Sequence, residues 1–372
     1  MGENKHTMSD LYQMQSLPLS AKIRMTERRI QDWIDHFGTD GVSISFSGGK
    51  DSTVLMDIVR NRMGYKDIPA VFVDVPTQYP ELREFALSWD NVEIIKPKIS
   101  FVQVCEEYGF PLISKEVSEV IYEARKNLEE IQSGKTKKYK YGKPCRLLQL
   151  EGKLPHTEKG ELTKEFSSQY DKSRYSYLLN APFGISDRCC KVMKKKPIHE
   201  YNKKSGRKSI TAQMASESRL RTKKWLQNGC NGFHVKEPIS NPMSFWTDQD
   251  ILLYIRENNL PICSVYGDIV EDWDRFDGVE GQMTISDVNG FENMGVFDAE
   301  RPPLKTTGCS RTGCMLCGFG CHLEKLGEGR FEMLKKTHPK MYNLLDVCKN
   351  NGVTMREAIE WVNEHGNLNI RL

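Results

Sequence analysis

The sequence lacks a long apolar run, and none of its segments approaches the ~18 residues that a membrane-spanning helix needs. The first twenty residues are polar and contain no apolar core of a secretory signal. The formal net charge is only +3, which is too small to indicate a nucleic-acid partner by itself, and no internal repeat is visible. We therefore expect a cytoplasmic protein without membrane contact. Its 372 residues leave room for one large domain and a smaller one.

Cysteine, by contrast, is frequent. Eleven cysteines in a cytoplasmic chain argue against a disulfide framework and favour metal, cluster or redox chemistry. Cys189 and Cys190 are adjacent, and four more lie within thirteen residues, at Cys309, Cys314, Cys317 and Cys321. The scattered ones are expected to be small core residues: Cys105, Cys145, Cys230, Cys263 and Cys348.

The stretch Ser45-Phe46-Ser47-Gly48-Gly49-Lys50-Asp51-Ser52 follows an apolar run at 42–46 and leads into a helical pattern. Two glycines at a strand-to-helix turn let the backbone approach a ligand, and the first helix amides point at whatever lies there. This combination predicts a phosphate site. The loop has neither the Walker spacing nor the dinucleotide-binding spacing. The alternative is a glycine turn that binds nothing.

Strand and helix patterns alternate through the first part of the chain, which predicts an α/β fold with a doubly wound, mainly parallel sheet. Asp74 ends the second strand, where ligands of such sheets bind, although an ordinary turn residue is equally expected there. The expected strands are 42–46, 70–74, 92–95 and 209–213, and the expected helices are 20–37, 79–88, 114–131, 248–258, 329–346 and 354–364. Another helix is expected after Ser186-Asp187, with a kink at Pro197.

We expect a nucleotide-binding domain at 1–265 with a basic insertion at about 133–175, a linker or insertion at 266–306, and a Cys-rich helical region at 307–372. Within 134–146 the basic residues alternate with Tyr139 and Tyr141: Lys135, Lys137, Lys138, Lys140, Lys143 and Arg146. Such a run is able to follow a phosphate backbone and stack on bases, but a solvated loop is the more ordinary explanation.

The clustered cysteines are flanked by glycines, which let the backbone fold tightly around an ion. Four thiolates suit structural zinc as well as an iron–sulfur cluster. The adjacent pair Cys189-Cys190, beside several lysines, is awkward for a single tetrahedral zinc ion.

Several motifs together carry a resemblance that covers about residues 25–324. The Ser47–Ser52 loop resembles the pyrophosphate loop of N-type ATP pyrophosphatases and sulfonucleotide (PAPS and APS) reductases. The double cysteine before a basic stretch and Pro197, the segment Pro242-Met-Ser-Phe-Trp-Thr-Asp-Gln-Asp250, and Gly313-Cys314-Met-Leu-Cys317 are similar to motifs of the PAPS reductase family. The resemblance implies a bound adenine nucleotide and a [4Fe–4S] cluster held by Cys189, Cys190, Cys314 and Cys317. It leaves Cys309 unexplained, either as a replacement ligand or as a redox or sulfur-carrying thiol.

The departures from that family concern the reductase chemistry. The chain has no cysteine after Cys348, where sulfonucleotide reductases carry a nucleophilic thiol, and Gln213 stands where an arginine would help to bind sulfate or phosphate. Val75-Pro76-Thr77 stands where many members have Thr-Gly. The chain is more similar to the branch that resembles the ATP pyrophosphatase of DNA phosphorothioation, which cleaves ATP between the α- and β-phosphates.

We therefore predict an ATP pyrophosphatase that works in sulfur transfer to a nucleic acid, DNA or tRNA, with a cysteine desulfurase or a thiol reductant as partner. Lys50, Asp51 and Cys309 are the predicted catalytic residues, and Asp51 would help to hold Mg²⁺. For Asp51 the alternative is stabilisation of a helix N-terminus. Arg221 is a further candidate for a phosphate contact, and exposed ion pairs are the alternative for residues 217–221. The predicted nucleotide-binding residues are Ser45, Ser47, Gly48, Gly49, Lys50, Asp51, Ser52, Asp74, Glu217 and Arg219.

Two other functions stay open. A PAPS or APS reductase that releases sulfite would need its thiol from Cys309 or Cys321. A non-catalytic nucleic-acid-binding protein would carry structural zinc and no iron.

Overall fold

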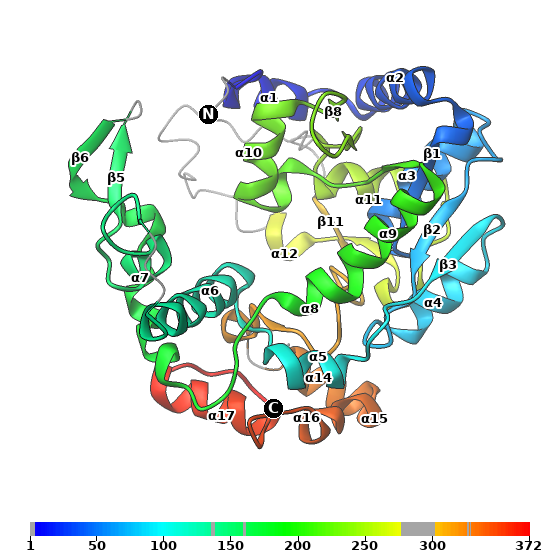
Figure 1. Ribbon diagram of the computed structural model, residues 1–372. Helices are drawn as coiled ribbons and strands as arrows, with labels where there is room; N and C mark the ends of the chain where they lie inside the picture. Colours follow the sequence, from blue (N-terminus) through cyan, green and yellow to red (C-terminus); the bar gives the residue numbers. More distant parts are fainter. Residues whose placement is uncertain (1–3, 135–137, 159–160, 277–301, 326, 328) are drawn as a thin grey trace. The chain divides into compact units, whose positions relative to one another are not determined.

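A computed structural model describes residues 4–134, 138–158, 161–276, 302–325, 327 and 329–372 (Figure 1). The chain forms two compact units. The first, called the sheet unit below, comprises residues 1–74, 78–96 and 198–312, and the second, called the cysteine unit, comprises 75–77, 97–197 and 313–372. Compactness does not show which segments fold alone, so the domain boundaries expected at 265 and 306 stay a prediction. Most of the expected linker, 277–301, lies outside the described residues.

The sheet unit is built on a six-stranded sheet (Figure 1). All neighbouring strands are parallel except the last pair, which is antiparallel. Ile44, in the central strand, pairs with Ala70 on one side and with Ile210 on the other. The predicted α/β fold with a mainly parallel sheet is therefore confirmed. The strands run in the order β3 (Val92–Ile95), β2 (Ala70–Val73), β1 (Val42–Phe46), β7 (Lys208–Ile210), β9 (Ile239–Ser240) and β8 (Asn231–Gly232).

Apolar side chains of strand β1 and of the helices form the core of this unit, with Trp33, Ile44, Phe46, Leu55 and Trp246 among its buried members. The amphipathic pattern of the second helix predicted its buried side, which includes Ile30 and Ile34. The helices of the unit are α1 (Met8–Gln15), α2 (Leu19–Phe37), α3 (Lys50–Asp57) with a π-helical extension at Ile58–Arg62, α4 (Pro80–Leu87), α10 (Arg219–Asn228), α11 (Asp248–Glu257) and α12 (Trp273–Phe276). Strands β10 (Ile269–Glu271) and β11 (Leu304–Thr306) form a separate antiparallel pair.

Helix α11 begins at Asp248, as expected. The Thr247 side chain accepts a hydrogen bond from the Asp250 amide, and the Asp250 carboxylate in turn accepts one from the Thr247 amide. Asp250 also forms an ion pair of 2.7 Å with Lys22 of α2, whose side chain is completely buried. A buried charge needs such a partner, so this pair ties α2 to the start of α11.

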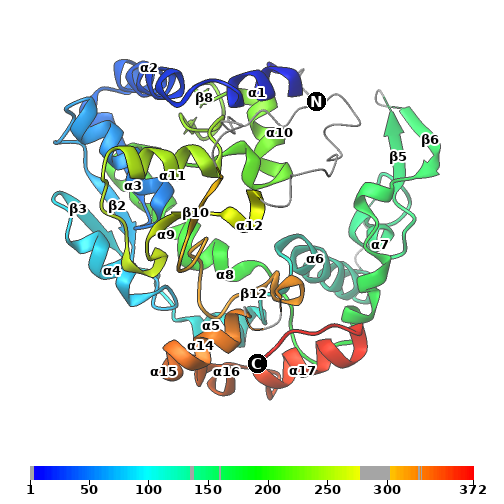
Figure 2. The same cartoon turned by 180° about the vertical axis from the view of Figure 1, so that it is seen from behind.

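The cysteine unit is mainly helical, and the predicted helical C-terminal region is confirmed (Figure 2). Two short parallel strands, β4 (Leu112–Ile113) and β12 (Gly318–Phe319), join its middle and its C-terminal parts. Its helices include α5 (Phe101–Tyr108), α6 (Lys115–Gln132), α7 (Cys145–Leu150), α8 (Arg188–Cys190), α14 (Arg330–Thr337), α15 (Pro339–Tyr342), α16 (Leu344–Val347) and α17 (Met355–Gly366). A hairpin of β5 (Pro155–Glu158) and β6 (Glu161–Phe166) and the pair β13 (Lys349–Asn350) and β14 (Val353–Thr354) complete it.

The structure has more order in the basic insertion than the sequence suggested. Helix α7 forms because Leu147, Leu148 and Leu150 are buried, and the β5–β6 hairpin follows it. Of the basic run, Lys135 and Lys137 lie outside the described residues, whereas Lys138, Lys140 and Lys143 are exposed.

Two expected helices are irregular. The one expected over 329–346 is divided into α14, α15 and α16, since His338 leaves helical geometry before Pro339. The helix after Asp187 contains a π-helical turn at Lys191–Lys195 and continues as α9 (Lys196–Ser205). Pro197, which has no N–H to donate, stands just after that turn and explains the break in the α-helical pattern. None of the helices in the described residues is long and apolar enough to span a membrane.

Candidate functional site

The loop between β1 and α3 is shaped around two glycines. Gly48 has a φ of +71°, which L-residues rarely adopt, and a Cβ there would lie 2.8 Å from the Leu82 carbonyl oxygen. Gly49 caps α3 without a side chain of its own. The helix therefore starts directly at Lys50, at the carboxyl end of a central parallel strand. This is the position at which such sheets bind ligands.

The serines of the loop bond to the loop itself. The Ser52 hydroxyl donates to the Gly49 carbonyl at 2.9 Å and accepts from the Ser47 amide at 3.2 Å. It also lies 3.0 Å from the Ser47 hydroxyl. These contacts hold the turn in shape and bring the predicted residues Ser47, Gly48, Gly49 and Ser52 together. Ser45 lies two residues before Ser47, within β1, where it pairs with Val71.

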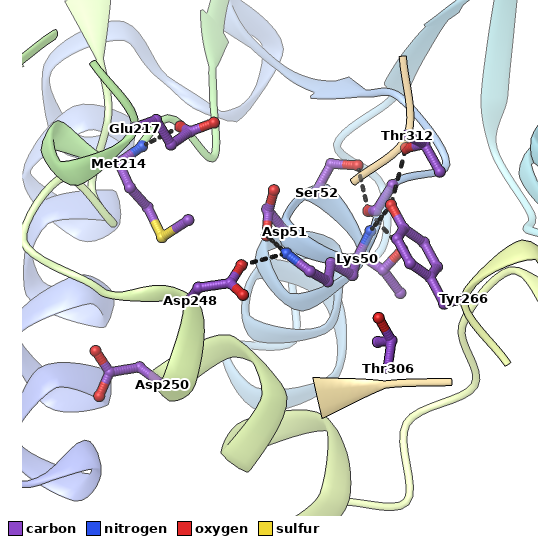
Figure 3. A network of polar contacts seen from close by, with 12 residues as sticks. Lys50, Asp51, Ser52, Met214, Glu217, Asp248, Asp250, Tyr266, Thr306 and Thr312 are labelled. Atoms are coloured by element: carbon purple, nitrogen blue, oxygen red, sulfur yellow. Dashed lines mark hydrogen bonds and ion pairs between the residues drawn. The ribbon is translucent and has the colours of Figure 1, made fainter. Parts of the chain in front are cut away.

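Lys50 is almost fully buried, with 2% of its side chain exposed, and lies between two carboxylates. Its Nζ is 3.1 Å from Asp51 Oδ1 and 2.5 Å from Asp248 Oδ1, at the first position of α11 (Figure 3). Burial by itself lowers the pKa of the ammonium, but the two carboxylates outweigh it and the pKa is raised. The lysine is thus held in its charged form at the start of α3.

The backbone amide of Lys50 donates a hydrogen bond of 3.1 Å to the Tyr266 hydroxyl, which lies 2.8 Å from the Thr312 hydroxyl (Figure 3). We did not predict Asp248, Tyr266 or Thr312 as site residues. Thr312 directly precedes the Gly-Cys-x-x-Cys motif, and Tyr266 lies sixteen residues after the family-like segment that ends at Asp250. Nothing in their sequence spacing indicates that both reach a loop more than two hundred residues away.

Two arginines lie near the acidic side of the loop. Arg221 forms an ion pair with Glu217, whose carboxylate also accepts from the Met214 amide at 2.9 Å. Burial and the neighbouring Arg311 lower the pKa of Arg221, whereas Asp51 acts in the opposite direction. Arg221 and Arg311 are thus within electrostatic range of each other, and Arg221 also of Asp51. Arg219, the predicted binding residue, is exposed at the start of α10.

Asp74 follows β2 as predicted, but its carboxylate is engaged by cations. It lies 3.1 Å from Nε of Arg83 and 3.9 Å from Nζ of Lys96. Its role in nucleotide binding stays a prediction.

The predicted catalytic Cys309 belongs to the sheet unit, whereas the other clustered cysteines belong to the cysteine unit. Its thiol is 3.9 Å from the Tyr79 hydroxyl, and its backbone amide donates to the Val265 carbonyl at 2.8 Å. Tyr79 belongs to the same unit and stands just before α4. No contact of Cys309 with the loop is seen among the described residues.

The four predicted cluster ligands gather in the cysteine unit. Burial raises the pKa of the Cys189 thiol, and Cys314, Cys190 and Cys317 raise it further. Burial and Cys314 likewise raise the pKa of Cys190. The structure therefore brings together the double cysteine and the Gly-Cys-x-x-Cys motif, which are more than a hundred residues apart in the sequence.

Cations accompany these thiols. Lys194 forms a hydrogen bond with Cys314. Burial lowers the pKa of this lysine, but Cys314 and Cys190 outweigh burial, so that the pKa is raised. Arg330 donates to the Cys317 carbonyl, and burial raises the pKa of the Cys317 thiol to about 11. Cys321 donates from its own buried thiol to the Cys317 carbonyl at 3.4 Å, and burial raises its pKa to about 12.

These thiols do not form a compact site for one metal ion. Among the residues that the structure describes, no three His, Cys, Asp or Glu side chains are arranged so that they could hold a metal ion. The donor set itself, four thiols that belong to one unit with Lys194, has the chemistry of a thiolate site. Neither the cluster nor a magnesium site is shown, and both stay predictions.

Comparisons with known proteins agree with the class that the parallel sheet and its glycine loop define, a nucleotide-binding α/β protein. The family model of the phosphoadenosine phosphosulfate (PAPS) reductase domain matches residues 136–318. The chain therefore carries a PAPS reductase domain, as its motifs predicted. The match lies downstream of the glycine loop, whose assignment depends on its own pattern and geometry.

Two other proteins show more distant similarity. A probable FAD synthase of Caenorhabditis briggsae is 25% identical over 95 residues, which are 23% of this chain and 18% of that protein. The chain thus spans less than a fifth of the length of this relative. A crystal structure of PAPS reductase from Candida auris, in a phosphate complex, aligns with a TM-score of 0.34 and 13% identity over 73% of this chain and 98% of that one.

The glycine geometry gives a matched test of the loop. We expect Gly48→Ala to destabilise the protein by more than the ~1–3 kcal/mol of left-handed strain, because the new Cβ meets the Leu82 carbonyl. Gly64→Ala is the control, since Gly64 has a similar φ of +82° and nothing within 4 Å of its Cβ position. Urea unfolding of both variants measures the difference. Equal losses would contradict the close approach at Gly48.

Proposed function

We propose that this protein is an ATP pyrophosphatase of the PAPS reductase family that activates an acceptor for sulfur transfer. The observation that supports this function best is the buried ammonium of Lys50 at the start of α3, with Asp51 and Asp248 on either side of it. The loop amides and the lysine suit a pyrophosphate group, whose charge grows as it leaves. Mg²⁺ would neutralise negative charge on the phosphates, and the carboxylate of Asp51 would help to hold it.

In the proposed reaction an acceptor oxygen attacks the α-phosphorus of ATP, and the bond to the β-phosphate breaks. Pyrophosphate leaves, and the acceptor carries an adenylate. The terminal sulfur of a persulfide on a partner cysteine desulfurase then attacks the adenylated atom and displaces AMP. A thiol reductant breaks the remaining S–S bond, so that one sulfur stays on the acceptor and the partner's cysteine leaves in a disulfide with the thiol. Lys50 and the start of α3 contribute by stabilising the pyrophosphate, which needs no proton from the protein at neutral pH.

The alternative, reduction of PAPS or APS to sulfite, needs a nucleophilic thiol. Cys321 is a poor candidate because its buried thiol has a raised pKa and is bonded to a carbonyl. Cys309 is half-buried, beside Tyr79, and is the first residue to test if sulfite is formed.

A product assay separates the two activities. We expect the protein with Mg²⁺ and ATP to release AMP and pyrophosphate, and Lys50→Ala to lose at least about a hundredfold in rate because one preorganised charge interaction is removed. Lys66→Ala, at an exposed lysine of the same unit, is the control. Sulfite from PAPS or APS with a thiol reductant, and no pyrophosphate from ATP, would replace the proposal by the reductase.

We further propose that Cys189, Cys190, Cys314 and Cys317 bind a [4Fe–4S] cluster. The cluster would supply an ordered anionic centre, while Lys194 and Arg330 offset the negative charge of its thiolates. The gathering of these four thiols in one unit supports this ligand set.

Iron content tests the ligand set. Anaerobically purified protein is expected to absorb near 400 nm, and Cys189→Ser and Cys317→Ser to lose iron and this absorption. Cys145→Ser, at an exposed cysteine of the same unit, is the control and should keep both. Stoichiometric zinc without iron, or full iron in both ligand variants, would show that the assignment is wrong.

As the acceptor we propose a nucleic acid, DNA or tRNA, bound by the basic insertion. Lys138, Lys140 and Lys143 are exposed there, and the Lys140 ammonium lies 5.0 Å from the Tyr141 ring centre. Lys143 is partly neutralised by an ion pair with Glu151.

Salt dependence tests this surface. Replacing Lys138, Lys140 and Lys143 by alanine should weaken binding of single-stranded oligonucleotides and reduce the slope of log K against log salt, by about 0.7 for each phosphate that a lysine no longer neutralises. Alanine at Lys335, Lys336 and Lys340, in the C-terminal helices, provides a control of equal charge change. An unchanged slope in the first variant would exclude the insertion as the binding surface.

A further inference from the structure

Three hydroxyl groups converge on one side of Gly49. A Cβ at this glycine would lie 3.2 Å from Ser47 Oγ, 3.2 Å from the Tyr266 hydroxyl and 3.4 Å from Thr312 Oγ1. The missing side chain of Gly49 therefore lets these three hydroxyls lie close to the backbone of the loop. The backbone amide of Lys50 lies beside this group and donates a hydrogen bond to the Tyr266 hydroxyl.

The donors and acceptors in this group leave a proton unused. A backbone amide can only donate, so the Tyr266 oxygen accepts from Lys50. Tyr266 and Thr312 then share one hydrogen bond, which uses one of their two hydroxyl protons. Neither hydroxyl has a further partner that is seen in the described residues. Whichever of the two donates in the shared bond, the other keeps an O–H for a ligand.

The two hydroxyls are held in place before a ligand arrives. The Tyr266 side chain is 2% exposed and packs with Leu82 and Cys263. The backbone around it is fixed by bonds from the Tyr266 amide to the Cys263 carbonyl and from the Gly308 amide to the Tyr266 carbonyl, at 3.1 and 2.9 Å. A ring so enclosed does not swing away easily, so its hydroxyl is preorganised at the loop.

We propose that Tyr266 and Thr312 are phosphate-binding residues of this loop, and that their free O–H donates to the pyrophosphate end of the bound nucleotide. This inference rests on the proposed function only in placing a nucleotide at the loop. Hydroxyls accompany Lys50 without adding positive charge, and they extend the donor set of the loop beyond its own backbone. A purely structural role, bracing the Lys50 amide, is the competing explanation.

Calorimetric titration with inorganic pyrophosphate, Mg·ATP and AMP tests the proposal. Tyr266→Phe combined with Thr312→Val leaves no O–H and should bind pyrophosphate and Mg·ATP about tenfold more weakly, the loss expected for one hydrogen bond to a charged group. Each single substitution leaves one O–H at the other position and should weaken binding less. AMP, which lacks the β- and γ-phosphates, should bind each variant as it binds the native protein. Thr312→Ser restores the hydroxyl and should restore the affinity.

Matched controls are Tyr65→Phe, which removes a hydroxyl bonded to Gln31, and Thr306→Val, which removes one bonded to the Cys309 carbonyl. Neither should change pyrophosphate binding. Thermal unfolding without ligand tells the two roles apart. A lowered melting temperature in the combined variant with native pyrophosphate affinity would establish the structural brace and overturn the proposal.

The outcome is separable from that of the proposed activity. If the native protein binds pyrophosphate through these hydroxyls but does not cleave ATP, the phosphate site stands and the pyrophosphatase reaction is wrong. If ATP is cleaved and the combined variant binds pyrophosphate normally, the activity stands and the assignment of Tyr266 and Thr312 is wrong.

Discussion

An ammonium ion buried at the end of a parallel strand must be surrounded by negative charge or strong acceptors, and this requirement organises the loop of this protein. Lys50 meets it with one carboxylate from its own helix and one from α11. Helix α11 is in turn positioned by the Thr247–Asp250 cap and by the buried pair of Asp250 with Lys22. Three helices, α2, α3 and α11, are therefore tied to each other through charges, and the apolar core alone would not fix their ends so closely.

The sequence was sufficient for the parts of the fold that depend on local pattern. The run 42–46 alternates Val42, Ile44 and Phe46 with serines, the loop has two glycines, and Thr247 is followed by an acidic residue three positions on. Strand β1, the loop and the start of α11 were therefore all predictable. The hairpin and α7 in the insertion were not, because the polar composition of residues 134–174 hides the few leucines that bury there. The division of the C-terminal helix was not predicted from Pro339 either. It became apparent from the backbone of His338, which lies outside helical geometry.

The candidate site divides in the same way. Five residues of the loop were recognisable because they lie within one short motif of the chain: Ser47, Gly48, Gly49, Lys50 and Ser52. Asp248, Tyr266 and Thr312 were not recognisable, since each reaches the loop through tertiary packing and has no unusual sequence spacing. For the thiols, sequence resemblance named four residues that belong to the same unit of the structure, although the two pairs are more than a hundred residues apart in the chain.

The start of α3 is closely bonded to its surroundings: the Lys50 ammonium has two carboxylate partners, and the amide of the same residue has a phenol partner. A phosphate chain bound there as proposed would therefore have to exchange partners with these groups. Exchange of this kind slows association, because existing interactions must loosen before new ones form. Small anions that meet the loop only briefly are then poor competitors, and a ligand that offers several phosphate oxygens at once has the advantage. The partners of Lys50 would thus slow the binding of small anions more than the binding of polyphosphates.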